Sequence, residues 1–278
     1  MSLSFEVAPL TTAHARAAHG LTTSVGWAHR YEDWLFALST GRGLGAFDSD
    51  GALRGAMMWF PYGEDFGSIG MVAVDPTVHR GGMGRALMTR TVADAAGRSL
   101  QLISTAAGRR LYDSLGFEAI GDNGAHMGTG VDPQIPGMIE PASAFDLPAL
   151  IALDTSALGY ARDGLMQALA EAGEIVVLRQ DGAIVGFSIC RLFGSGRVIG
   201  PVVARENHEA RRLIAFWLRQ YAGQPLRIDV PKEHAAIVAW LNELGLKRGG
   251  ESPIMVRGTP PTPTGPARRF AMVSQAMG

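Results

Sequence analysis

The chain has 278 residues, of which 47% are hydrophobic, and its 25 basic and 26 acidic side chains give a formal net charge of -1. This length allows two ordinary domains with full cores, and the charge balance argues against a surface for nucleic acid or anionic membranes. A single cysteine, Cys190, excludes an intrachain disulfide and a cysteine-rich zinc site.

The first half of the chain begins with strands and continues with alternating helices and strands. Asp50–Gly51 lies between two apolar runs, which is typical of a hairpin, because glycine accepts the positive φ that a primed turn requires. Expected strands cover 45–47, 53–61, 68–74 and 100–104, and expected helices cover 82–96 and 106–115. This order predicts an α+β fold with a mostly antiparallel, partly parallel central sheet.

The second half repeats the first at an offset of about 130 residues. The segment Asp50–Gly55 recurs as Asp181–Gly186, and two further segments recur in the same order. A Pro/Gly-rich segment at 132–137 predicts a boundary between one domain at 1–132 and another at 133–278. Expected strands of the second domain cover 174–178, 184–192 and 197–203, its helices 207–220 and 233–244, and residues 270–277 form a last strand or short helix.

The main functional signal is the loop that joins Val74 to the helix at 82–96. Pro76 ends the strand, and three glycines then lead directly into the helix. The first N–H groups of a helix have no partner within it, so they form an anion site, and glycines let a pyrophosphate approach the backbone. A P-loop is excluded because no Gly-Lys-Ser/Thr is present, and the dinucleotide fingerprint needs a third glycine where Leu87 stands.

The remaining interpretation rests on His79–Gly84, which resembles motif A of the GNAT N-acetyltransferases, although that family usually has Arg or Gln at position 79. The resemblance implies two tandem GNAT-like domains, each with a central sheet splayed at the acetyl-CoA strand, and acetyl-CoA as co-substrate. The residues that it implies for cofactor binding are Val72, Ala73, Val74, His79, Arg80, Gly81, Gly82, Met83, Gly84, Arg85, Thr105 and Gly108.

A second landmark, Leu111-Tyr112 followed by Gly116-Phe117, resembles motif B of the same family. There the tyrosine lies beside the CoA sulfur, and a phenol suits the protonation of a leaving thiolate. Backbone N–H groups of Met71–Val74 would stabilise the thioester oxyanion. Glu64, or its neighbour Asp65, is the candidate base through water, although solvated charges of a hairpin turn explain both acids better.

In the second domain Ala204–Glu209 replaces the glycine loop and Leu241 replaces the tyrosine. We therefore expect a degenerate domain that does not bind CoA and instead shapes the acceptor pocket. Trp27 and Tyr31 are candidate acceptor contacts, although a packing stripe accounts for their spacing as well. Asp154 is a third candidate, with a local ion pair at a helix end as the alternative.

These residues predict an N-acetyltransferase that acts on a primary amine of a small molecule or peptide; the alternative is a silent acetyl-CoA sensor. A protein acetylase would need an open groove. No metal is expected, because His29 and His126 lack partners at ligand spacing. We expect no nucleic-acid or membrane partner and a cytoplasmic location, because the N-terminus lacks a signal peptide and no apolar run reaches membrane-spanning length. The acceptor and the oligomeric state stay open.

Overall fold

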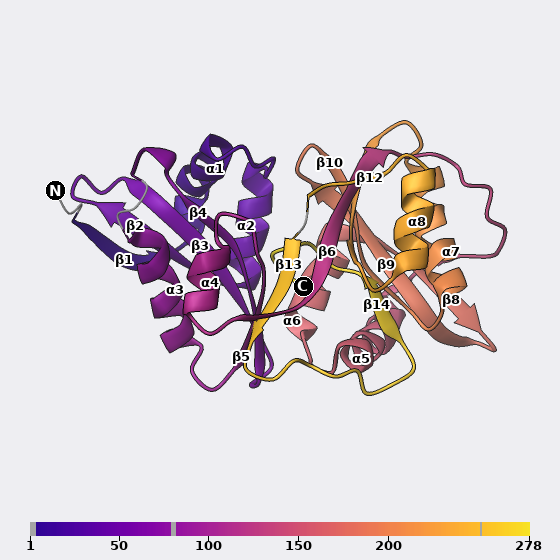
Figure 1. Cartoon of the computed structure of the whole chain (residues 1–278). Helices are drawn as coiled ribbons and strands as arrows, with labels where there is room; N and C mark the ends of the chain where they lie inside the picture. The colour runs from indigo at the N-terminus through magenta and orange to yellow at the C-terminus, as the bar shows by residue number, and fades with distance from the viewer. Residues whose placement is uncertain (1–3, 79–81, 251) are drawn as a thin grey trace.

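The computed structural model describes residues 4–78, 82–250 and 252–278, and its strands join into one continuous sheet that runs through both halves of the chain (Figure 1). The first half, residues 1–132, contributes β1 (Phe5–Leu10), α1 (Ala15–Ser24), α2 (Tyr31–Thr40), β2 (Arg42–Asp48), β3 (Leu53–Tyr62), β4 (Phe66–Val74), α3 (Met83–Asp94), β5 (Ser99–Ile103), α4 (Arg109–Ser114) and β6 (Glu118–Thr129). Short 3-10 turns precede α1 at Thr12–His14 and follow β4 at Pro76–Val78.

The second half, residues 133–278, repeats this order. It contributes β7 (Glu140–Pro141), a 3-10 turn at Ala144–Asp146, α5 (Leu147–Leu158), α6 (Asp163–Ala172), β8 (Gly173–Gln180), β9 (Ala183–Phe193), β10 (Gly196–Ala204), α7 (Asn207–Gln220), β11 (Pro225–Pro231), α8 (Ala235–Glu243), β12 (Lys247–Arg248), β13 (Ser252–Arg257) and β14 (Arg268–Ala271). Within the described ranges no helix is both long and apolar enough to cross a membrane.

The sheet confirms the predicted fold class. Its main path runs β1-β2-β3-β4-β5-β13-β6-β11-β10-β9-β8-β7, and the β4–β5 and β10–β11 pairs are parallel while the other strand pairs are antiparallel. Both predicted hairpins form. In the second, Asp181 and Gly182 have φ of 50° and 80°, as a primed turn requires. In the first only Gly51 has a positive φ, because the turn is longer and the Asp48 carboxylate accepts the N–H groups of Asp50 and Ala52.

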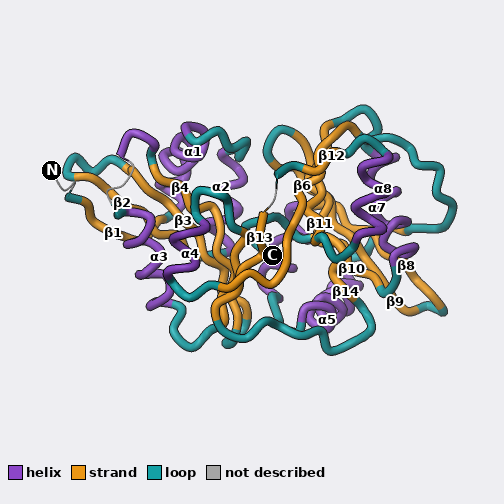
Figure 2. Tube along the Cα trace, in the orientation of Figure 1, coloured by secondary structure: helices purple, strands orange, loops and turns teal. Residues whose placement is uncertain are grey.

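Two strands cross between the halves. β13 of the second half lies between β5 and β6, and β6 of the first half pairs with both β13 and β11 (Figure 2). The sheet therefore joins the two halves through exchanged strands, and the boundary after residue 132 stays a prediction from the sequence repeat. Because of this exchange, both halves of the chain contribute residues to the region between β4 and β10.

Helices of both halves also meet on one side of this junction. Trp34 of α2 and Met166 of α6 are fully buried in one apolar cluster together with residues of β3, β4 and β9. Burial of each such side chain contributes about 1.5–3 kcal/mol, so the cluster holds the two halves together. α3 covers the sheet of the first half with Leu87 and Met88, in a separate cluster.

Candidate active site

β4 changes its backbone path at the point where it leaves β5. The last pair between the two strands is Ile69 with Leu102, and beyond it no described strand follows β4 on that side. Against β3, Gly70 pairs with Met58 and Ala73 with Ala56, so an extra residue is bulged out near Met71. Met71 has a φ of 54°, which is uncommon for a side chain other than glycine. The polar backbone groups around Met71 are therefore available to a ligand.

This opening leads into a cavity of about 670 Å³ that both halves line. The first half contributes the α1–α2 loop, the splayed strands, α4 and the end of β6, whereas the second half contributes the β9–β10 turn, the start of β11 and the C-terminal segment. The lining residues are Gly26–His29, Ile69–Val72, Leu102, Ile103, Thr105, Tyr112, Met127–Thr129, Phe193–Arg197, Pro225–Arg227 and Ser274–Ala276.

Tyr112 reaches the cavity from α4, and its ring packs directly on the start of the same helix. A Cβ at Gly108 would lie 2.6 Å from the Tyr112 ring, so glycine is required there. Burial raises the pKa of Tyr112 to about 12. The phenol therefore stays protonated at neutral pH and is available as a hydrogen-bond or proton donor at the cavity wall.

The predicted anion site falls at the N-terminus of α3. Gly82 is the N-cap, with a φ of 78° that only glycine adopts freely, and Gly84 lies in the first turn. Met83 is buried, and Arg85 is exposed and donates to Ser114 Oγ of α4. The predicted contacts His79, Arg80 and Gly81 lie outside the described residues.

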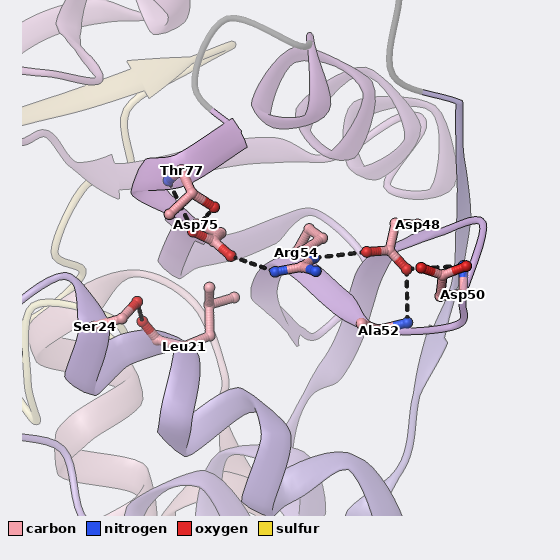
Figure 3. A network of polar contacts seen from close by, with 8 residues as sticks. All are labelled: Leu21, Ser24, Asp48, Asp50, Ala52, Arg54, Asp75 and Thr77. Carbon is pink, nitrogen blue, oxygen red and sulfur yellow. Dashed lines mark hydrogen bonds and ion pairs between the residues drawn. The ribbon is translucent and has the colours of Figure 1, made fainter.

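A polar network fixes the entry to this loop (Figure 3). Asp75, directly after β4, accepts hydrogen bonds from the backbone N–H and hydroxyl of Thr77 and from Nη1 of Arg54. Arg54 also contacts the Asp48 carboxylate. These bonds hold the pKa of Asp75 below its ordinary value, and the hydrogen bonds from Thr77 are the largest cause. Burial of the carboxyl acts in the opposite direction and raises the pKa. The chain thus leaves β4 in one direction, toward α3.

The other predicted cofactor residues lie nearby but differ in position. Val72 and Thr105 line the cavity, whereas Ala73 is buried in the core and Val74 packs against the α3 side. Thr105 also anchors α4, because its carbonyl and hydroxyl oxygens accept the N–H of Gly108.

Among the residues predicted for the acceptor and the base, only Trp27 lines the cavity. Tyr31 begins α2, with the Arg16 guanidinium 5.2 Å from its ring centre. Glu64 lies in the exposed turn between β3 and β4, at the opposite end of β4 from the bulge.

Asp154 is 1% exposed and forms a two-pronged ion pair with the buried Arg162, with N–O distances of 2.7 and 2.9 Å. Arg162 in turn donates to a backbone oxygen of Gly278 at 2.8 Å. The local ion pair is therefore the arrangement found, and it anchors the C-terminal segment behind the cavity.

His29 was not singled out from the sequence as a site residue, yet it lines the cavity. Its ring lies edge-on to Trp27 and to Phe193, with centroid distances of 5.7 and 5.6 Å. Burial lowers its pKa to about 4, so the imidazole is uncharged at neutral pH. Among the described lining residues, it is the one side chain that titrates as a base below neutrality.

The second half also supplies lining residues that sequence reasoning missed, and the β9–β10 turn is the clearest case. Gly194 N donates to Asp33 Oδ2 at 2.9 Å, and Arg30 Nη2 donates to Leu192 O at 3.0 Å. The turn signal Gly-Ser-Gly is visible at 194–196. Its position against α2 depends on strand exchange between the halves, which no local pattern encodes.

The equivalent opening in the second half is filled by the chain itself. β10 and β11 separate after Ile199 and Ile228, and β14 pairs with β10 beyond that point. At the N-terminus of α7 the Glu209 carboxylate accepts the N–H groups of Arg205 and Glu206. Leu241 is fully buried. In the second half, β14 thus pairs with the strand that would otherwise be open, and Glu209 accepts the N–H groups that would otherwise bind an anion.

Among the described residues, no group of three His, Cys, Asp or Glu side chains is arranged to hold a metal ion.

Comparison with known proteins finds the same kind of domain in each half. Residues 41–119 and residues 150–271 match two family models, each described as an acetyltransferase (GNAT) domain. The chain is 28% identical over 282 residues to an uncharacterized N-acetyltransferase, YitH, of Bacillus subtilis (strain 168), with 98% of each chain covered.

Solved structures share the fold along the whole chain. A putative acetyltransferase from Pyrococcus horikoshii superposes with a TM-score of 0.83 at 15% identity, covering 99% of this chain and 96% of the other. A tandem GNAT protein from the clavulanic acid biosynthesis pathway superposes with a TM-score of 0.63 at 13% identity, covering 91% of this chain and 98% of the other.

Proposed function

The chain is a tandem member of the GNAT acetyltransferase family, and we propose that it transfers the acetyl group of acetyl-CoA directly to a primary amine in the cavity between its halves. The observation that carries this proposal is the bulged end of β4, which has no strand partner on its β5 side and lines the same cavity as Tyr112. A thioester held along β4 would have backbone donors on one side and a phenol on the other.

The first half is the proposed acetyl-CoA site. The N-terminus of α3, with Gly82 and Gly84, would bind the diphosphate through backbone N–H groups. Val72 and Thr105 lie along the path that the pantetheine arm would take from there into the cavity. His79–Gly81 are further proposed contacts and lie outside the described residues.

The reaction needs one bond formed and one broken. The amine nitrogen attacks the thioester carbon, and the carbon–sulfur bond then breaks while the thiolate gains a proton. Backbone N–H groups near Met71 would stabilise the oxyanion, and Tyr112 would donate to the departing sulfur. Because the pKa of Tyr112 is raised to about 12, its proton is present throughout the physiological range.

The amine must also lose a proton. Glu64 is the acid that the sequence suggests for this role, but it lies in the turn at the far end of β4 and outside the cavity lining. We therefore assign the role of the base to His29, whose uncharged imidazole lies in the cavity wall between Trp27 and Phe193. An uncharged imidazole accepts a hydrogen bond from an attacking amine.

The second half would act as a wall of the acceptor pocket without binding CoA. This proposal is supported by β14, which fills the opening of β10, and by Glu209, which already caps α7. Phe193–Arg197 and Pro225–Arg227 would then contact the acceptor.

The test is release of free CoA thiol from acetyl-CoA across a panel of primary amines. The proposal expects amine-dependent release with at least one of them, together with acetylated amine in the product mixture. Tight binding of acetyl-CoA with no amine-dependent release would contradict it and would indicate a sensor.

A further inference from the structure

The charged side chains that line the cavity are all of one sign. Two arginines, Arg197 and Arg227, line the cavity, and no carboxylate side chain of the described residues does so. The two come from neighbouring parallel strands, since Arg197 of β10 pairs with Leu226 of β11 and Val198 pairs with Arg227. Both therefore lie at the same end of the second half's sheet, but their side chains leave opposite faces of it, because Arg227 is the residue after the partner of Arg197. Arg197 lies against the Tyr221 ring, whereas Arg227 lies beside the Phe193 ring.

Each arginine keeps N–H groups that are not used inside the protein. Arg227 donates Nε and Nη2 to the buried Asp229 at 3.0 and 3.1 Å, and its Nη1 has no partner among the described residues. Arg197 lies 3.9 Å from the centre of the Tyr221 ring, and its one contact to Glu174 is 3.4 Å long. The described residues give its Nη2 no partner.

A third arginine adds charge behind the wall. Arg191 is 3% exposed and lies 4.9 Å from the centre of the Phe193 ring, which itself lines the cavity. Within the described part of the chain its Nε and Nη2 have no hydrogen-bond partner and no carboxylate pairs with it. Burial lowers its pKa only to about 10, so the guanidinium remains charged at neutral pH. Arg191 thus adds a positive charge behind the wall beside Phe193, whereas Arg227 and Arg197 are each paired with a carboxylate.

An unpaired positive charge behind the cavity wall selects among amines. It would repel a polyamine, whose remaining charges are positive, and attract an amine that also carries an anion. The planar fork of a guanidinium matches the two oxygens of a carboxylate. The Phe193 ring lies beside Arg191 and Arg227, and Trp27 lines the same cavity. Both rings would contact the apolar part of the same molecule.

We infer that the acceptor is a primary amine that also carries a carboxylate, and that Arg227 binds this carboxylate so that the amine faces the thioester. The inference rests on the proposed acetyl transfer and adds the substrate class to it. Arg227 is in this account a specificity-determining residue of the second half, which gives a half without a cofactor site a role in lining the cavity.

The test compares amines in matched pairs. γ-Aminobutyrate is compared with butylamine, phenylalanine with phenethylamine, and glucosamine 6-phosphate with glucosamine, and spermidine is added as a cationic acceptor. The inference expects kcat/KM to be at least about tenfold higher for the carboxylated member of a pair, as for a charge-assisted, two-pronged contact. A preference for glucosamine 6-phosphate over both carboxylated amines would overturn the inference that the acceptor carries a carboxylate. The site would then bind a different anion.

Variants assign the preference to Arg227. Because Arg227→Gln alone would leave Asp229 buried without its partner, the test variant is Arg227→Gln/Asp229→Asn. Its kcat/KM for the carboxylated amine should fall about tenfold, while that for the partner amine without a carboxylate changes less than about twofold. Arg197→Gln, whose side chain leaves the other face of the sheet, should keep the preference. Arg90→Gln, which removes an exposed arginine of α3, is the matched control.

Two outcomes separate this inference from the proposed function. Turnover that is fastest with butylamine, phenethylamine or spermidine, or an Arg227→Gln/Asp229→Asn variant that slows both members of a pair equally, would overturn the inference and keep the acetyltransferase. Binding of acetyl-CoA without acetylation of any amine would remove both.

Discussion

Gly70 of β4 and Ala276 of the C-terminal segment touch so closely that a Cβ at position 70 would lie 2.4 Å from both Cα and Cβ of Ala276. Ser68 Oγ donates to Ala276 O at 3.0 Å, and the Tyr62 hydroxyl donates to Met277 O at 2.7 Å. The last residues of the second half therefore rest on the strand that carries the bulge. Glycine at position 70 is needed for this contact.

Replacement of Gly70 by alanine should displace the C-terminal segment. The added methyl meets backbone as well as side-chain atoms of Ala276, so the expected loss in the free energy of unfolding is about 1–3 kcal/mol. Urea unfolding measures it. Gly20→Ala is the matched control, because nothing lies within 4 Å of that site in α1 and alanine favours a helix. Equal stability of Gly70→Ala and wild type would show that the segment does not rest on β4.

Tyr112→Phe should slow the chemical step. Loss of a donor to the leaving thiolate is expected to lower kcat by about 10²-fold or more, while the Kd for acetyl-CoA stays within about twofold, because the ring packing on Gly108 is kept. Steady-state rates with calorimetric Kd values separate the two effects. Unchanged kcat would remove Tyr112 from the mechanism.

His29 should make stability depend on pH. Its pKa is about 4 in the folded chain and 6.5 ordinarily, so between these values the unfolded chain binds a proton that the folded chain does not. Stability is therefore lost as the pH falls from about 6.5 to 4. Between pH 7 and pH 4.5 the wild type should lose about 2–3 kcal/mol more than His29→Gln.

Urea unfolding of both proteins at the two pH values gives this difference directly. The comparison with the variant cancels the contributions of His126 and His234, whose pKa values are also lowered by burial. Parallel pH dependence of the two proteins would mean that His29 is accessible to protons in the folded state.

Asp154→Asn should be a stability variant. It leaves the fully buried Arg162 charge without its carboxylate, which costs about 3–5 kcal/mol in comparable buried pairs. Asp154→Leu/Arg162→Met, which removes both charges, should recover most of this loss. A stable Asp154→Asn protein whose acceptor KM is raised would instead support the acceptor contact that the sequence suggests.

The sequence predicts well those elements that depend on local periodicity and on the residues of the turns. The strands around Asp50–Gly51, the helix after Gly82 and the helix of Tyr112 all lie within a few residues of their expected bounds. The approach of Tyr112 to the strand opening follows from motif order alone. These features depend on neighbours in the chain.

The acceptor side could not be predicted in the same way. Arg227 reaches the cavity only because β6 and β13 exchange places and bring β11 beside the first half. His29 is uncharged only because tertiary contacts bury it. Glu64, by contrast, lies near the site residues in sequence but at the wrong end of an extended strand, where each residue adds about 3.3 Å.

The most direct test of the account is calorimetric titration of acetyl-CoA into the wild-type chain and into Gly82→Val. We expect one site per chain, because β14 and Glu209 occupy the equivalent positions of the second half, and affinity at least about tenfold weaker in the variant, since valine is strained at a φ of 78° and would crowd the diphosphate. Two equivalent sites, no heat of binding, or an affinity that Gly82→Val leaves unchanged would contradict the account.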